Sequence, residues 1–308
     1  MMIEDVLNSI CGRNYCLSVI GCKSVCTSRS VSSNSGTSFC KATRIAAALL
    51  CLLVSYLDTS IAVAEEFAVV NSKGNLVLGV ASIPEYIGSD DQQAVPLIIS
   101  NFSFGNINGV FEGTGARFDL YTHPILEFGS VINLALPRDD LSSEAVTQVG
   151  DIGFAIELGA YLGFAMPFTS LPEGELSGYV SVRNSLIGPA NGTQVLGVLE
   201  YFFAPLRFLR VGVNTSFTLT TRDYMQEYFG VNEAQSARSG LPVFRPDGGL
   251  RDITFTLYSV LSLSPSWGIF GIVQSSRLLD DAARSPIVSQ EGSRDQLSTG
   301  IGLFLNFF

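Results

Sequence analysis

The sequence predicts an all-β protein: a single antiparallel transmembrane β-barrel of about 12 strands that follows a cleaved signal peptide. Three observations support this. Hydrophobic residues make up 47% of the 308 residues and charged residues only 15%, against about a quarter in ordinary soluble chains. No run of about 18 apolar residues follows residue 65, which argues against a helical multi-span protein. Instead, short stretches alternate between apolar and polar residues, as strands of a membrane barrel do.

The N-terminal region is typical of an export signal. Residues 41–64 are interpreted as a signal peptide, because two basic residues precede an apolar run at 45–56 and a small-x-small sequence ends it. Cleavage is expected before Glu65. A retained anchor helix is the alternative, but an acidic residue interrupts the apolar run. Residues 1–40 are interpreted as an unstructured leader or a misassigned start, which leaves 65–308 as the outer-membrane β-barrel.

Charge and cysteine content narrow the function classes. Residues 65–308 carry 13 basic and 25 acidic side chains, a net charge of −12, so nucleic acid is not an expected partner. All six cysteines precede residue 52, and a large closed barrel needs no disulfides. No cysteine or histidine spacing suggests a metal centre, and we expect no cofactor.

Twelve segments carry the strand pattern, each bounded by turn-forming residues. Period-two alternation is clear within 207–220, where Leu209 and Val211 oppose Asn214 and Ser216. A soluble β-sandwich also gives this period, but these segments have the length of tilted spanning strands and aromatic residues at their ends. The expected strands are 75–83, 94–104, 107–112, 115–121, 126–136, 152–165, 175–187, 194–203, 207–220, 251–263, 267–278 and 296–308.

Basic side chains fall on the polar face of several expected strands. Arg183 and Arg210 are the candidate lumen charges, because rings of charge set the ion selectivity of a pore. They can equally pair with Asp119, Glu157 or Glu200 inside a closed lumen. Twelve strands fall between filled eight-stranded barrels and open sixteen-stranded porins, so strand number leaves conduction open. The arginines expected to point inward are Arg117, Arg183, Arg210, Arg222, Arg251 and Arg277.

Three short motifs occur in a fixed order, within residues 80–91, 224–231 and 281–288. Together they resemble the MipA/OmpV family of outer-membrane proteins, and the resemblance covers residues 70–308. The first reading of the motifs is structural, because their proline and glycine residues are typical of turns. The motif residues expected in turns and loops are Pro84, Tyr86, Gly88, Ser89, Asp90, Tyr228, Phe229, Gly230, Ser285 and Pro286.

The resemblance implies a barrel surrounded by the lipid bilayer and lipopolysaccharide of a Gram-negative outer membrane. Some family members are described as scaffolds that join a murein hydrolase to a peptidoglycan synthase in the periplasm, and others as porin-like proteins or adhesins. It therefore implies, first, a non-enzymatic scaffold or interaction protein for peptidoglycan-remodelling enzymes. A narrow porin-like channel for small solutes is the second interpretation, and an outer-membrane hydrolase is the third.

The hydrolase interpretation is weak because His123 is the only histidine and no Gly-x-Ser-x-Gly sequence is present. The acidic pairs at 90–91 and 280–281 have oxygen ligands suited to a divalent cation, although solvated loop charges are the favoured interpretation. The chain ends on Phe308, which resembles the signal read by the barrel-assembly machinery. The register of that last strand stays open, because Phe308 shares a face with Asn306.

Overall fold

The structure, a computed structural model, describes residues 73–104, 107–139, 141–169, 174–188 and 192–307. The chain divides into units 1–59 and 60–308, and all described residues belong to the second. The expected leader, the signal peptide and Phe308 lie outside the described residues. In the described part, no helix has the length and apolarity needed to cross a membrane.

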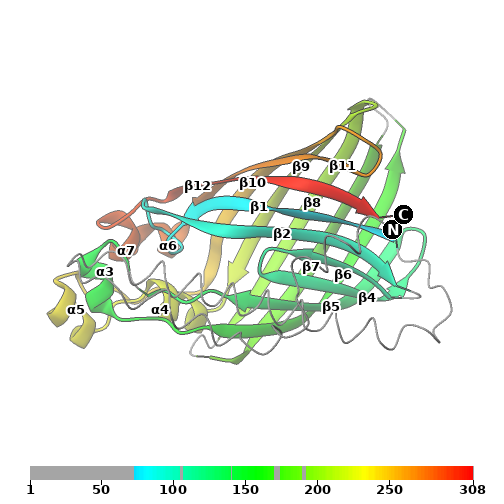
Figure 1. Ribbon diagram of the computed structural model, residues 1–308. Coiled ribbons are helices and arrows are strands. Elements are labelled where there is room, and N and C mark those ends of the chain that lie inside the picture. Colours follow the sequence, from blue (N-terminus) through cyan, green and yellow to red (C-terminus); the bar gives the residue numbers. More distant parts are fainter. Residues whose placement is uncertain (1–72, 105–106, 140, 170–173, 189–191, 308) are drawn as a thin grey trace, which may run out of the picture. The chain divides into compact units, whose positions relative to one another are not determined.

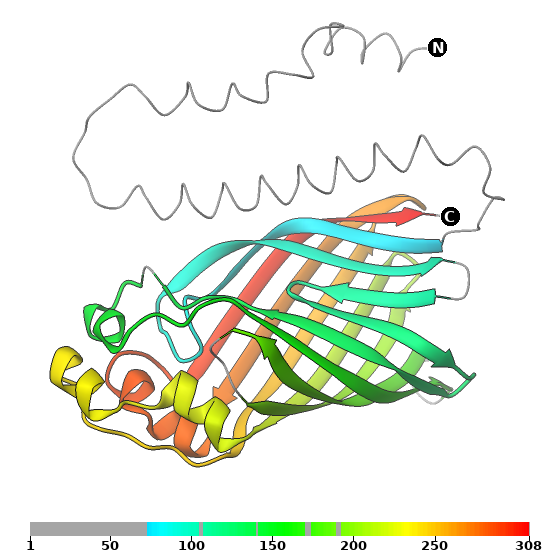
Figure 2. The ribbon, with the colours of Figure 1, turned by 90° about the horizontal axis from the view of Figure 1, so that it is seen from below.

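Twelve antiparallel strands close into one barrel, in which each strand pairs with its neighbours in sequence and β1 pairs with β12. Figure 2 shows the red β12 beside the cyan β1 at this closure. The strands are β1 (Lys73–Pro84), β2 (Gln92–Phe104), β3 (Ile107–Glu112), β4 (Gly115–Thr122), β5 (Leu126–Ala135), β6 (Ala155–Phe168), β7 (Gly174–Ile187), β8 (Thr193–Leu206), β9 (Leu209–Thr220), β10 (Gly249–Ser262), β11 (Trp267–Leu278) and β12 (Asp295–Phe307).

The predicted fold class is confirmed, and the differences lie at strand ends. β6 begins at Ala155 rather than 152, because Ile152 forms an isolated bridge with Arg138 within a long loop. β9 begins at Leu209 because residues 207–208 form a tight turn.

Most strands have 10 to 14 residues, but β3 has six and β4 has eight. A two-residue turn joins these two short strands, and Gly113 in it has φ of +61°. Such hairpin turns favour glycine because positive φ brings no Cβ clash. The β3–β4 hairpin therefore reaches only part of the way along its neighbours, as Figure 2 shows.

The two faces of the wall differ in the way a membrane barrel requires. Side chains such as Val80, Leu162 and Ile301 are about 60% exposed although they are apolar. An apolar surface of this extent is expected only against lipid. Side chains on the other face contact strands that are not their neighbours: Arg117 on β4 lies over the Tyr179 ring on β7, 4.0 Å from its centroid. Such contacts can pass only through the lumen.

Five short helices lie at one end of the barrel, opposite the end where β12 finishes (Figure 1). They belong to the long loops after β5, β9 and β11, whereas the connections at the opposite end are short. Outer-membrane barrels have long external loops and short periplasmic turns, so the helical end faces outward. The helices are α3 (Glu144–Val149), α4 (Arg222–Phe229), α5 (Glu233–Ser239), α6 (Asp280–Arg284) and α7 (Pro286–Ser289).

Candidate functional site: a lumen closed by its outer loops

The outer loops pack against one another into a compact layer, which we call the cap. It comprises residues 85–91, 136–139, 141–154, 221–248 and 279–294. The cap has an apolar interior of its own, in which Val146, Phe229 and Ile287 are fully buried. One buried cluster consists of Tyr86, Val146, Val149, Val231, Leu241 and Ile287. The other consists of Met225, Phe229, Ala282 and Val288, together with Leu278 at the end of β11.

Hydrogen bonds between loops fix the cap. The Ser285 hydroxyl donates to the carbonyl of Phe229 at 2.7 Å. The Tyr86 hydroxyl donates to the carbonyl of Glu291 at 2.9 Å, and burial raises the pKa of this tyrosine, so it stays a neutral donor. Arg138 donates to the carbonyl of Tyr228 at 3.0 Å. Because partners are far apart in sequence, each bond ties one loop to another.

Two glycines of the motifs are required by close packing. Gly88 has φ of +108°, and a Cβ there would lie 2.5 Å from a methyl group of Val288. A Cβ on Gly230 would lie 1.9 Å from the side-chain amide of Gln226. A larger residue at Gly88 would push against Val288 of another loop, and one at Gly230 would clash with the last turn of its own helix. The Gly88–Val288 contact and the Ser285–Phe229 hydrogen bond bring the three motifs together, although at least 49 residues separate consecutive motifs in the sequence.

The other motif residues also lie in or next to the packed outer loops. Ser89 is buried and its carbonyl accepts from the Gln296 amide at 3.0 Å. Pro286 begins α7 and is buried, a position where its missing N–H costs nothing. Pro84 is the last residue of β1, whereas Asp90 is exposed. The motifs thus serve packing and turn formation in the cap.

One cap helix reaches into the lumen. Tyr224 of α4 is almost fully buried and stacks on Tyr228, with ring centroids 4.4 Å apart. Its hydroxyl accepts from Arg251 at 2.8 Å, and Arg251 also donates to Gln194 at 3.0 Å. A β-bulge in β10 next to Arg251 accounts for its inward direction. The cap is thereby joined to the polar part of the barrel wall.

We call the lumen side of β4 to β9 the polar sector. Its centre is Glu157, 3% exposed, which accepts hydrogen bonds from Asn133 at 2.9 Å and Gln194 at 2.5 Å. The nearest nitrogen of Arg183 is 3.7 Å from the same carboxylate. Two amides and an arginine thus surround this buried carboxylate, which offsets part of the cost of its burial.

The polar sector continues toward the periplasmic end. There Arg117 lies over the rings of Tyr179 and Tyr161, and the Tyr161 hydroxyl bonds to Asp119. Further round the wall, the Tyr258 hydroxyl donates to Glu200 at 2.8 Å.

The lumen side of β10 to β12, β1 and β2 is different, and we call it the apolar sector. Its buried core consists of Val77, Leu97, Val260, Phe270 and Phe304, from five strands. Arg210 marks its border, because the guanidinium lies 5.2 Å from the centroid of the Phe304 ring. In this sector the buried lumen-facing side chains pack against one another along the wall.

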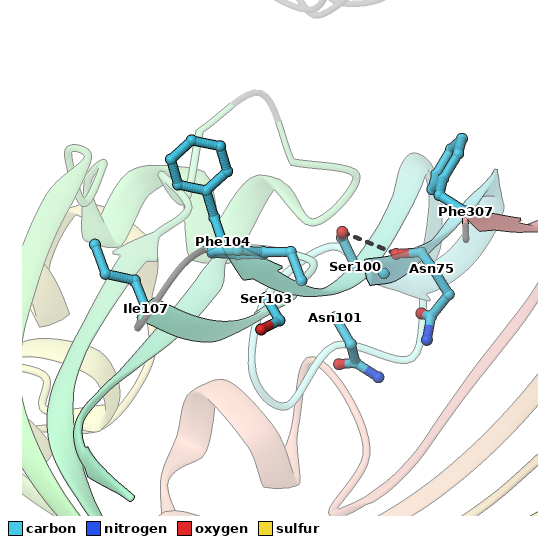
Figure 3. A pocket seen from close by; sticks show the side chains of 9 residues that line it. Asn75, Ser100, Asn101, Ser103, Phe104, Ile107 and Phe307 are labelled. Atoms are coloured by element: carbon cyan, nitrogen blue, oxygen red, sulfur yellow. Dashed lines mark hydrogen bonds between the residues drawn. The ribbon is translucent and has the colours of Figure 1, made fainter. Parts of the chain in front are cut away.

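The periplasmic rim is hollowed beside β1 and β2 (Figure 3). Figure 3 shows Phe104, Ile107 and Phe307 pointing to one side of the wall, with Asn75, Asn101 and Ser103 on the other. This hollow measures about 470 Å³, and a neighbouring one of about 510 Å³ is lined additionally by Asn108, Asp119 and Asn306.

Two expectations about lumen arginines are wrong. Arg222 lies in α4 of the cap, two-thirds exposed and 3.4 Å from Asp247. Arg277 lies on the outer face of β11, half exposed and 3.4 Å from Asp295. Both lie near strand ends, where the alternation of residues does not fix the direction of a side chain. Arg183 and Arg210 are on the lumen side, and their role in ion selectivity stays a prediction.

The remaining candidates lie apart from the lumen. His123 is exposed in the β4–β5 turn. Asp281 accepts from the backbone N–H of Asp247 at 2.7 Å and from Arg284. Among the described residues, no three acidic, cysteine or histidine side chains are grouped as a metal site. Phe307 is half exposed on the outer face and Phe304 is buried inside, which gives the register of the last described strand.

The apolar outer surface, the closed ladder and the capped lumen define an outer-membrane β-barrel protein. The family described as "MltA-interacting protein MipA" matches residues 76–307. The chain therefore belongs to this family, and its place is the bilayer and lipopolysaccharide of the outer membrane. A comparison with curated proteins gives no match.

Solved barrels resemble the chain only distantly. The NanC porin has 8% identity and a TM-score of 0.40, with 76% of this chain and 100% of that chain covered. An outer membrane channel from Pseudomonas putida F1 has 9% identity and a TM-score of 0.39, with 79% and 98% covered. The translocator domain of autotransporter NalP from Neisseria meningitidis has 12% identity and a TM-score of 0.31, with 86% and 98% covered. Fold likeness at this level does not transfer function.

Proposed function

We propose that the protein is a non-enzymatic interaction protein of the outer membrane, which holds a murein hydrolase or synthase at its periplasmic rim. The observation that carries the proposal is the cap, because a lumen covered by packed outer loops is not an open pore. The description of the family as MltA-interacting supports a protein partner. The barrel-assembly machinery is a further expected partner during insertion.

The energy needed to open the cap is substantial. Exposing Phe229, Ile287 and Val146, all fully buried, costs about 5–9 kcal/mol at about 1.5–3 kcal/mol for each large side chain. A cap that opened this way would be open in fewer than about one molecule in a thousand. A barrel whose cap stays closed in this way is suited to holding a partner protein continuously at the membrane.

The experiment joins conductance and binding. The full chain, expressed with its export signal and purified from outer membranes, is placed in planar bilayers and offered a purified membrane-bound lytic transglycosylase. We expect no discrete channel steps and saturable binding. Arg207, exposed in a periplasmic turn, supplies a variant: Arg207→Glu should weaken binding, whereas Arg245→Glu in the outer loops should not. Channel steps without binding would contradict the proposal.

A narrow gated channel is the second candidate, favoured by the charged lumen wall. Arg117, Glu157 and Arg183 would be costly in a dry interior, and water in the polar sector would stabilise them. In this case channel steps appear, and Arg183→Gln shifts the preference toward cations because a lumen cation is lost. Channel steps with unchanged ion preference would remove the arginine from this role.

A further inference from the structure

The barrel ladder is interrupted on one side, just below the cap. Strand β2 runs from Gln92 to Phe104, but β3 pairs with it only from Ile99 onward. Among the described residues, backbone hydrogen bonds of residues 92–97 go to β1 alone. The interruption lies between the tip of the β3–β4 hairpin and the helical end of the barrel, to the left of the hairpin in Figure 1.

Contacts frame this interruption as a window. Below, the hairpin tip is held to both sides, by Gly113 N–H to Ile98 at 2.8 Å and by Leu134 N–H to Thr114 at 2.9 Å. Above, the backbone N–H of Ser142 donates to Glu85 at 2.9 Å. The free edge of β2 forms one side, and the end of β5 with Leu136 forms the other.

The position of Pro96 indicates that the sequence itself is adapted to an unpaired edge on β2. Strand proline is confined to edges, where its missing N–H leaves no ladder bond unmade. The carbonyl of Ile98, two residues away, points toward the hairpin, where it accepts from Gly113. Alternate residues of a strand point their backbone groups to the same side, so Pro96 places its nitrogen on the open side.

Phe104, an aromatic residue at the periplasmic end of β2, serves as the reference for the height of the window along the membrane normal. Pro96 lies eight residues further along β2, about 20 Å higher for a rise of about 3.3 Å per residue and a tilt of about 40°. Gln92 lies about 30 Å above Phe104 by the same rule. Because the apolar band of such barrels is about 25 Å tall, the window crosses the outer boundary of the hydrocarbon.

Below Gln92 and Gln93 at the upper end of β2, the rims of the window are apolar on both faces of the wall. Val80, Pro96 and Leu136 are exposed on the outer face. Val95 and Leu97 are on the lumen side, and Leu97 packs in the apolar sector with Val77. An apolar lumen wall directly behind a gap at lipid height suits a hydrocarbon chain and not a hydrated solute.

From this placement we infer that the window admits an acyl chain of an outer-leaflet lipid into the apolar sector. The chain contacts Val95 and Leu97, while ester carbonyls of the lipid accept hydrogen bonds from backbone N–H groups of the free β2 edge, which hydrocarbon alone would leave unsatisfied. Since the cap covers the axial exit, the window is the lateral route between lumen and membrane. This inference does not depend on the proposed partner.

Fluorescence quenching by lipid tests the inference. The described chain contains no cysteine, so Val95→Cys labelled with a thiol-reactive fluorophore reports the window; the unsubstituted protein is the blank. Ser276→Cys on β11 is the matched control. It too lies on the lumen side, nine residues from an aromatic at the periplasmic end, but β10 and β12 both pair at this position. Val80→Cys on the lipid face gives full quenching.

In vesicles of phosphatidylcholine brominated near the carbonyl end of its acyl chains, we expect the Val95 label to be quenched at least about twofold more than the Ser276 label. A second pair, Leu97→Cys and Gln274→Cys, should show the same order. Equal quenching within both pairs would overturn the inference, provided that heat-modified mobility shows folded barrels. Quenching by an added brominated free fatty acid but not by brominated phospholipid would contradict the inference that the acyl chain belongs to a membrane lipid.

Discussion

The two sectors of the lumen place different demands on the same barrel. In the apolar sector, Phe270 and Phe304 fill space against aliphatic neighbours, and shape alone decides the fit. In the polar sector, Glu157 is held by two amides and an arginine, and each partner must be present. One barrel wall can therefore be a packed apolar core on one side of the lumen and a hydrogen-bonded network on the other. This is possible because the alternation of strand residues requires apolar side chains only on the lipid face, and lumen-facing positions can be apolar or polar.

The largest expected effect is in the apolar sector. Phe304→Ala removes a ring that is 6% exposed and should lower the free energy of unfolding by about 3–5 kcal/mol, through lost burial and a cavity. Urea unfolding in detergent, followed by tryptophan fluorescence and heat-modified mobility, measures it. Phe307→Ala, on the half-exposed outer face, is the control and should cost much less. Equal losses would erase the distinction between the two faces.

The next effect distinguishes a network from a packed core. Glu157→Leu should cost about 3 kcal/mol because it leaves Arg183 charged without its carboxylate. Adding Arg183→Leu should restore part of this loss, whereas no second truncation restores Phe304→Ala. The measurement is a double-mutant cycle by urea unfolding. Additive losses in that cycle would show that water screens the pair.

A smaller effect is expected at the border of the sectors. Arg210 contacts the Phe304 ring through a cation–π interaction, so Arg210→Gln should cost about 0.5–1 kcal/mol. Lys at the same position should retain part of the interaction. Unfolding midpoints of the two variants measure the difference. If Arg210→Gln were as damaging as Glu157→Leu, the border would belong to the polar network.

The smallest effect lies outside both sectors, on the cap surface. A backbone hydrogen bond from Asp247, assisted by Arg284, lowers the pKa of the Asp281 carboxyl. Such a group adds stability above its unfolded pKa, and this is lost as pH falls toward the folded value. Asp281→Asn should therefore remove less than about 0.5 kcal/mol at neutral pH and nothing in strong acid. A deficit that persists in acid would contradict this origin.

Strand positions were predictable because alternation is a local signal, and boundaries erred by only a few residues, as at Ala155. The cap was not predictable, because contacts such as Ser285 to Phe229 join residues 56 positions apart in the sequence. The three sequence motifs contain residues of the cap, but the motifs alone do not show that these residues contact one another. Arg222 and Arg277 were misplaced because direction near a strand end depends on the loop. Phe304 falls on a face with glycines and Asn306, so its packing partners could not be read locally.

The contacts between the first and last loops have a consequence for the lifetime of the folded protein. β1 and β12 are the one pair of adjacent barrel strands, among the described residues, that are not consecutive in sequence. Above that junction, Ser293 N–H bonds to Gly88 at 2.8 Å and Gln296 to Gly88 and Ser89. These bonds, which we call the clasp, hold the ends of β1 and β12 together at the junction where the two strands can separate during unfolding. The clasp forms only after closure, so it slows unfolding more than it speeds folding.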